Sequence, residues 1–203
     1  MMVLGLVGQS GSGKSTVAKM FAELGAAWLD VDQVGRDVVK PGSPCLFRIA
    51  EEFGHDFLMP DGSLDRRRLG KVVFSNREKL LVLNSITHPA IAHRVGQWVE
   101  GLRGGPEPPE IAVLDAAVLF ELGLDSLCDF IVLVKADPEA QARRIVERDG
   151  LSSDDARARI RSQRSAEDLE ADADFVIVTD GTLAETMAEV AQVYSAAIAN
   201  NRG

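Results

Sequence analysis

The residues with the clearest chemical meaning lie near the N-terminus, where positions 8–15 read Gly, four residues, then Gly-Lys-Ser. In this pattern the glycines let the backbone wrap around a phosphate with its N–H groups turned inward. The lysine bridges the β- and γ-phosphates of a nucleoside triphosphate, and the next hydroxyl ligates Mg²⁺. We therefore predict that Mg²⁺ binds at Ser15 and that the phosphates bind Gly8, Gly11, Ser12, Gly13, Lys14, Ser15 and Thr16.

Acidic residues end two of the expected strands. Asp30 and Asp32 are two residues apart at the end of a short apolar segment, so both should project toward one side beside the loop. A sugar hydroxyl is a poor nucleophile at neutral pH, and a carboxylate that accepts its proton assists phosphoryl transfer. Capping of the next helix is the alternative role. Asp115, after the apolar run 111–114, resembles the Walker B acid that holds Mg²⁺ through water, although many buried strands end in Asp.

Arginines are concentrated between positions 141 and 164. This segment contains seven arginines and four acidic residues, so it is locally positive in a chain of formal net charge −9. Helical spacing places five of them on two faces, Arg144 and Arg148 on one, and Arg157, Arg161 and Arg164 on the other. Two such helices could close as a lid and bring guanidinium groups to the transferred phosphoryl group. The alternative is a solvated face in which Arg143 pairs with Glu139 and Glu147.

The composition restricts the class of protein and its partners. A chain of 203 residues with 46% hydrophobic residues suits one well-packed domain. The negative net charge argues against nucleic acid or an anionic membrane as a partner. Cys45 and Cys128 lie far apart and outside any Cys-x-x-Cys pattern, which favours reduced cysteines in a soluble cytoplasmic protein. We expect neither a signal peptide nor a membrane span, expect no metal besides magnesium, and leave the oligomeric state open.

The order of expected elements begins a parallel α/β sheet, with a strand at 2–7, a helix at 14–24 and a strand at 27–31. Continuous apolar runs at 111–114, 130–134 and 175–178 predict central parallel strands. Between them the pattern is mostly helical at 33–102, with a break expected at His88-Pro89. Later helices should begin at Asp137-Pro138 and near 152–155, and a last one should cover about 183–199.

Two classes of nucleotide-binding protein compete at this point, a kinase and a switch protein that binds guanine nucleotides. The switch would need an Asn-Lys-x-Asp motif, and the sequence has none. The stretch from Asp32 to Gly35 imitates the Asp-x-x-Gly of such switches, but it follows the phosphate loop too soon. The arginine-rich segment favours the kinase.

The residues described above, together with others along the chain, resemble those of the dephospho-coenzyme A kinase family over nearly the whole length. The shared features are spread along the chain: Gly11 to Thr16, Asp30-Val-Asp32 with Arg36, Pro41-Gly42, Phe53-Gly54, Asp61 to Arg66 with Leu69 and Phe74, Leu83-Asn84, His88-Pro89, Leu119-Phe-Glu121, Gln141-x-Arg143, Arg148 to Gly150, Gln163 and Ala173-Asp174. Taken together, the Asp-x-Asp, Gly-x-Leu-Asp-Arg, His-Pro and Phe-Glu elements are quite specific.

The resemblance implies a three-layer P-loop kinase fold of the α/β class. Its parts would be a core with a five-stranded parallel sheet (about 1–32, 111–140 and 173–203), a helical acceptor-binding region (about 33–102) and a lid (about 141–164). It also implies that ATP phosphorylates the ribose 3′-hydroxyl of dephospho-coenzyme A, the last step of coenzyme A synthesis. A related kinase with another acceptor, or a non-catalytic nucleotide sensor, remains the alternative.

The resemblance assigns further roles. Lys14, Asp32 and Arg143 would be catalytic, with Asp32 as the base. Arg148 would contact the nucleotide, and the substrate contacts would be Asp32, Arg36, His88, Asp115 and Glu121.

Several positions depart from the family's usual residues. Val7, Gln9 and Ser10 stand where Thr, Gly and Ile are common, Ala117 replaces a proline, Leu169 a lysine and Thr179 an asparagine. The loop glycines remain, so the phosphate cradle should be intact. Leu169 and Thr179 belong to the region that should flank adenine. These two changes therefore leave open how strongly the protein prefers ATP over other nucleotides.

Overall fold

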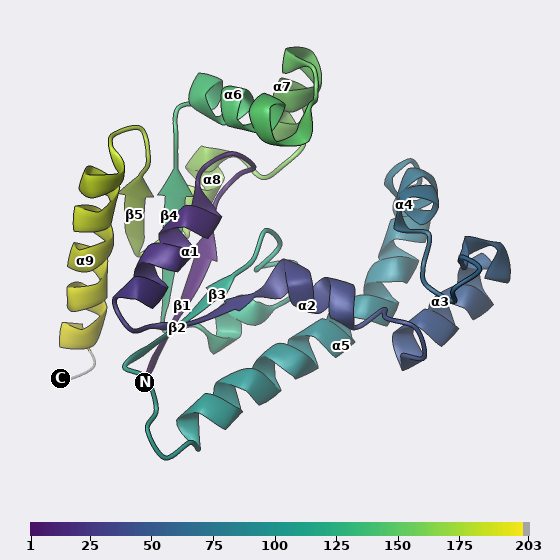
Figure 1. Ribbon diagram of the computed structural model, residues 1–203, viewed down its shortest axis with the longest axis horizontal. Coiled ribbons are helices and arrows are strands. Elements are labelled where there is room, and N and C mark those ends of the chain that lie inside the picture. The colour runs from purple at the N-terminus through teal and green to yellow at the C-terminus, as the bar shows by residue number, and fades with distance from the viewer. Residues whose placement is uncertain (201–203) are drawn as a thin grey trace. The chain divides into compact units, whose positions relative to one another are not determined.

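Five parallel strands form one sheet in the order β2-β3-β1-β4-β5, as the computed structural model of the chain shows for its described residues, 1–200 (Figure 1). The strands are β1 (Met2–Val7), β2 (Ala27–Asp30), β3 (Ile111–Asp115), β4 (Phe130–Lys135) and β5 (Phe175–Val178). The predicted α/β class and five-stranded parallel sheet are confirmed, and each strand lies within one residue of its predicted bounds. The central position predicted for 175–178 is wrong, because β5 is an edge strand of the sheet and its Val176 and Val178 side chains are exposed.

The helices cover most of the remaining chain. They are α1 (Lys14–Glu23), α2 (Val31–Asp37), α3 (Pro44–Phe53), α4 (Arg66–Phe74), α5 (Arg77–Arg103), α6 (Pro138–Asp149), α7 (Ser153–Arg161), α8 (Ala166–Ala171) and α9 (Leu183–Asn200), with short 3₁₀ turns at η1 (His55–Phe57) and η2 (Leu124–Leu127). Within residues 1–200, none of these helices combines the length and the apolar character that crossing a bilayer requires.

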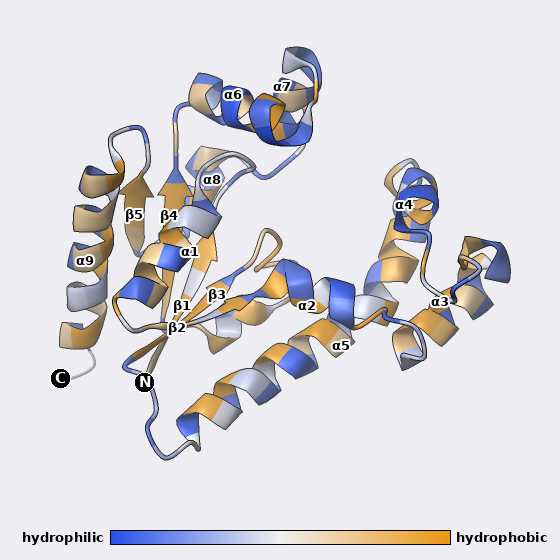
Figure 2. Ribbon diagram, viewed as in Figure 1, coloured by the Kyte–Doolittle hydropathy of each residue, from blue (hydrophilic) through white to orange (hydrophobic). Residues whose placement is uncertain are grey.

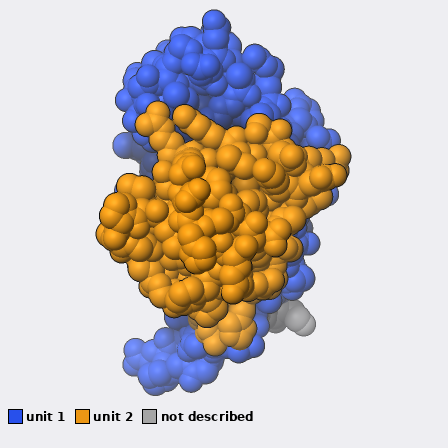
Figure 3. All heavy atoms as spheres, turned by 90° about the vertical axis from the view of Figure 1, so that its right-hand side faces the viewer, with its two compact units in different colours: residues 1–30, 99–203 blue, residues 31–98 orange. Residues whose placement is uncertain are grey.

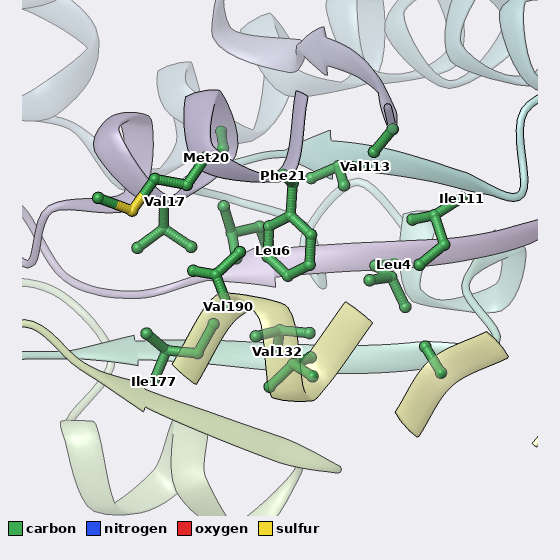
Figure 4. Close-up of a cluster of buried hydrophobic side chains, with 14 of the residues drawn as sticks. Leu4, Leu6, Val17, Met20, Phe21, Ile111, Val113, Val132, Ile177 and Val190 are labelled. Atoms are coloured by element: carbon green, nitrogen blue, oxygen red, sulfur yellow. The ribbon is translucent and has the colours of Figure 1, made fainter. Parts of the chain in front are cut away.

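The central strands β1, β3 and β4 are strongly apolar, as the hydropathy colouring of Figure 2 shows, because both of their faces are buried. On one face, α1 and α9 pack against the sheet through Phe21 and Val190, which meet Leu4 and Leu6 of β1 (Figure 4). Gly5 faces the other side, where a Cβ atom would come within 2.7 Å of the Leu119 side chain. Residues after β3 therefore pack directly on the β1 backbone.

The chain divides into two compact units (Figure 3). The first consists of residues 1–30 and the chain from Val99 onward, and it contains the sheet. The second is helical and consists of residues 31–98. Its limits resemble the predicted acceptor-binding region, 33–102.

The break predicted at His88-Pro89 is wrong, because α5 runs through Pro89 without interruption. A proline inside a helix removes one hydrogen bond and costs about 3 kcal/mol. Helix α5 offsets this cost by burying Ile86, Ile91 and Val95, at roughly 1.5–3 kcal/mol each.

Helices α6 and α7, the first two after β4, each begin directly after a capping residue. The Asp137 carboxylate accepts hydrogen bonds from the N–H groups of Glu139 and Ala140, which confirms the start predicted at Asp137-Pro138. Helix α7 begins after the capping residue Ser152 and ends at Arg161. The expectation that Arg164 shares a helix face with Arg157 and Arg161 is therefore wrong, since Arg164 lies beyond the helix end.

Candidate active site

The phosphate loop connects β1 to α1 at the carboxyl edge of the sheet, and its backbone requires glycine at several positions. Gly8, Gly11 and Gly13 have backbone φ values of 152°, 79° and 90°, which residues other than glycine rarely adopt. A Cβ atom at Gly8 would lie 2.4 Å from the Val134 carbonyl oxygen, and one at Gly11 would lie 2.5 Å from that of Gln141. The loop is therefore closely packed on its outer side.

The side chains of the loop and of the first turn of α1 differ in exposure. The Ser12 side chain is buried, and within the described part of the chain its Oγ atom has no hydrogen-bond partner. A buried polar atom left unpaired costs about 1–3 kcal/mol. Lys14 is half-buried, and Ser15 and Thr16 are exposed in the first turn of α1. These residues fit a phosphate group.

Asp115 lies where the sequence predicted it, at the carboxyl end of β3. It is opposite Leu6 in the register with β1, one residue before the end of that strand. Its side chain is buried, and the Ala116 N–H donates to the Leu6 carbonyl oxygen at 3.3 Å. The acid is therefore anchored next to the start of the phosphate loop.

The predicted lid is a hairpin of α6 and α7 with ion pairs on its surface. Arg148 binds Asp149 through two hydrogen bonds of 2.7 and 2.8 Å, and Arg159 binds the same carboxylate at 2.8 Å. The bonded Arg148 and the charge of Arg159 lower the pKa of Asp149. Arg143 is exposed, and Glu139, its expected partner in the alternative interpretation, pairs with Arg157 at 2.8 Å.

The segment after α7 is hydrogen-bonded to the phosphate loop. The Gln9 side-chain amide donates to the Arg164 carbonyl oxygen at 3.0 Å, and the Ser10 N–H donates to Gln163 Oε1 at 2.8 Å. The Arg164 guanidinium lies 4.8 Å from the centre of the Phe120 ring and pairs with Asp172. Sequence reasoning missed this connection, although Gln9 stands where the family commonly has glycine and Gln163 is one of the residues shared with the family.

Glu121 is exposed in the turn after β3, next to Phe120. It therefore belongs to the sheet-containing unit, as do the phosphate loop, Asp115 and the two lid arginines with predicted site roles, Arg143 and Arg148.

The other predicted substrate residues belong to the helical unit. Asp32 and Arg36 are exposed one helical turn apart on α2, and His88 lies half-buried on α5. The Arg36 guanidinium donates to the Gln33 side chain at 3.2 Å, and Arg66 donates to the Arg36 carbonyl oxygen at 2.7 Å. Burial, followed by the nearby charge of Arg36, lowers the pKa of Arg66.

A cavity of about 310 Å³ lies within the helical unit. Its walls are mostly apolar, and Arg66 and Thr87 contribute polar groups. The other lining residues are Gly35, Val39, Ile49, Leu64, Leu69, Gly70, Val73, Phe74, Leu83 and Ile91. No local pattern in the sequence predicts this cavity, because its walls come from four helices and from two loop residues, Val39 and Leu64.

The sheet order and the glycine-rich loop between β1 and α1 define a P-loop kinase. Consistent with this class, shikimate kinase from Acinetobacter baumannii has the same fold, with a TM-score of 0.57, 16% identity, and alignment over 98% of this chain and 94% of that one.

The sequence comparisons define the family within this class. A family model described as dephospho-CoA kinase matches residues 2–185, and the chain belongs to this family. The dephospho-CoA kinase of Carboxydothermus hydrogenoformans is 42% identical, over 93% of this chain and 90% of that protein. The Corynebacterium glutamicum enzyme is also 42% identical, over 95% and 96%.

Two solved structures share the fold of this chain. A Thermus thermophilus protein of 31% identity aligns with a TM-score of 0.80 over 96% of both chains. The dephospho-CoA kinase of Campylobacter jejuni shares the fold, with a TM-score of 0.71, 24% identity and 98% of both chains covered. The chain is accordingly a phosphotransferase that phosphorylates dephospho-CoA with ATP in coenzyme A biosynthesis.

Proposed function

We propose that the chain transfers the γ-phosphoryl group of Mg-ATP to the ribose 3′-hydroxyl of dephospho-CoA, with the triphosphate bound by residues 8–16. The observation that carries the proposal is the phosphate loop itself, in which three glycines have positive φ and Lys14 and Ser15 begin the helix that follows. We place the reaction in the cytoplasm, where the two unpaired cysteines, Cys45 and Cys128, stay reduced.

Each proposed role in the sheet-containing unit follows from the charge of a side chain. Lys14 neutralises the β- and γ-phosphates, while Arg143 and Arg148 reach the nucleotide when the lid moves. Arg148 must then exchange Asp149 for a phosphate oxygen, which the exposed position of this ion pair permits.

Ser15 would hold Mg²⁺, with Asp115 acting through water. When bound, the ion supplies positive charge that offsets the charge developing on the phosphoryl oxygens. Glu121 completes the proposed substrate contacts on this unit.

The helical unit supplies the proposed groups for the acceptor. Asp32 accepts the proton of the attacking hydroxyl, and His88 contacts the substrate. Dephospho-CoA combines a diphosphate with a long pantetheine arm, so a matching site needs cations next to apolar walls. Arg36 and Arg66 are two neighbouring cations, and Arg66 also lines the apolar cavity. We therefore assign the diphosphate to these arginines and the apolar part of the arm to the cavity.

Filling the cavity tests the assignment of the arm. Gly70 lines it, and a Cβ atom there would make contact only with the exposed ring of Phe74, at 3.4 Å. Gly70→Leu should raise the KM for dephospho-CoA by about tenfold, since it displaces apolar groups worth about 1.5–3 kcal/mol, and should leave the KM for ATP unchanged. Gly96→Leu is the matched control, because a Cβ atom at this helical glycine meets nothing within 4 Å. An unchanged KM for dephospho-CoA in folded Gly70→Leu would place the arm elsewhere.

An acceptor panel tests the reaction. The chain is incubated with Mg-ATP and with dephospho-CoA, adenosine, nucleoside monophosphates or shikimate, and each product is identified by mass and by the position of its new phosphate. We expect one added phosphate on the ribose 3′-hydroxyl of dephospho-CoA and little product elsewhere. Preferred phosphorylation of a nucleoside monophosphate would indicate a related kinase, and ATP loss without acceptor product would contradict the proposal.

A further inference from the structure

Two residues outside the glycine-rich motif bind carbonyl oxygens of the phosphate loop. Thr179, directly after β5, donates from Oγ1 to the Ser12 carbonyl oxygen at 2.7 Å. Arg144 of α6 donates to the Gly11 carbonyl oxygen at 3.1 Å, to Thr179 Oγ1 at 2.9 Å and to the Thr179 carbonyl oxygen at 2.6 Å. Thr179 is buried, and Arg144 is half-buried. We call these two residues the loop clamp.

The loop clamp fixes the direction of the Thr179 hydroxyl. A guanidinium group can only donate hydrogen bonds, so Thr179 Oγ1 must accept the bond from Arg144. The hydroxyl proton is then left for the Ser12 carbonyl oxygen. Arg144 therefore makes the Thr179 hydroxyl a donor toward the loop.

Holding the Ser12 carbonyl also orients the N–H group of Gly13. Both belong to one planar peptide unit, and the described chain has no cis peptide bond, so the N–H points opposite to the carbonyl. The carbonyl is turned outward to Thr179, which turns the Gly13 N–H to the inner side of the loop. A Cβ atom at Gly13 would lie 3.3 Å from Thr179 Oγ1, so this side of the loop is closely packed against Thr179.

We propose that Thr179, oriented by Arg144, is a positioning residue for the phosphates. It holds the Ser12–Gly13 peptide so that the Gly13 N–H is ready to donate to a phosphate oxygen before the nucleotide binds. This inference rests on the phosphate site of the proposed function. This positioning role differs from recognition of the adenine nucleobase, which the place of Thr179 after the last strand would otherwise suggest.

The test compares a triphosphate ligand that carries the adenine nucleobase with one that lacks it. Binding of Mg-ATP and of Mg-tripolyphosphate is measured by calorimetry for the wild type and for Thr179→Val, which keeps the side-chain shape and removes the hydroxyl. We expect both ligands to bind about tenfold more weakly to the variant, by the same factor, because a hydrogen bond to a charged oxygen is misaligned. Thr179→Ser keeps the hydroxyl and should restore both affinities to within about twofold of the wild type.

Thr186→Val is the matched control. Its hydroxyl is also in a buried threonine and donates to a backbone oxygen, that of Thr182 at 3.2 Å, but it lies on α9. This variant should lose stability without losing affinity, and Thr179→Ala serves as the second variant if valine prevents folding. Unchanged binding in a folded Thr179 variant, or weaker binding of ATP alone, would overturn the inference. Wild-type protein that binds neither ligand would remove the proposed phosphate site as well.

Discussion

Lys14→Ala is expected to lower the rate of dephospho-CoA phosphorylation by roughly 10³-fold or more. The ammonium group is the proposed charge between the β- and γ-phosphates, and its removal leaves the charge developing on the transferred group without its nearest cation. The half-buried position of Lys14 strengthens this interaction, because water screens it less. The rate is measured as coenzyme A formed at saturating ATP and dephospho-CoA.

Lys19→Ala is the control for this variant. Lys19 is an exposed lysine on the same helix, five residues further on, so its removal changes the net charge equally and leaves the loop intact. The control should keep the wild-type rate. If Lys14→Ala also kept it, the phosphate loop would not be the catalytic site.

Asp32→Asn is expected to lower kcat by at least ~10²-fold while the Kd for Mg-ATP stays the same. An amide of nearly the same shape cannot accept the proton of the attacking hydroxyl, and general-base assistance contributes about 10²–10⁴-fold. Single-turnover formation of coenzyme A measures the chemical step, and calorimetry with Mg-ATP measures binding separately.

Asp37→Asn provides the comparison for the Asp32 variant. Asp37 lies on the same helix and pairs with Lys40 at 2.7 Å, and it has no proposed role in the reaction. A rate close to wild type is expected for it. Normal chemistry in Asp32→Asn would exclude Asp32 as the base, and a large loss in Asp30→Asn would transfer the role to that residue.

The sheet was predictable because its strands are short continuous apolar runs, a pattern that in β1, β3 and β4 follows from burial on both faces. The N-terminal strand at Met2–Val7 and the last strand at Phe175–Val178 have the predicted bounds. Pro89 misled the prediction, since a local rule about proline does not include the tertiary packing that carries α5 through it. The prediction that Arg164 shares a helix face with Arg157 and Arg161 failed because it extended helical spacing past the helix end at Arg161.

The candidate site was predictable only where a local motif specifies it. The loop residues from Gly8 to Ser15 form one contiguous pattern with a known mechanism, and the structure places them between β1 and α1. The contacts of Thr179 and Arg144 with the loop join residues 167 and 133 positions apart. No local pattern in one sequence reveals a hydrogen bond over that distance, so these contacts became visible only in the folded chain.

A crystal structure of the chain with Mg²⁺ and a non-hydrolysable ATP analogue tests the central claim most directly. We predict density for the β-phosphate inside the loop formed by residues 8–15, within hydrogen-bond distance of its N–H groups, with Lys14 in contact with the γ-phosphate. An analogue bound at another place, with the loop empty, would contradict the assignment of this loop as the nucleotide site.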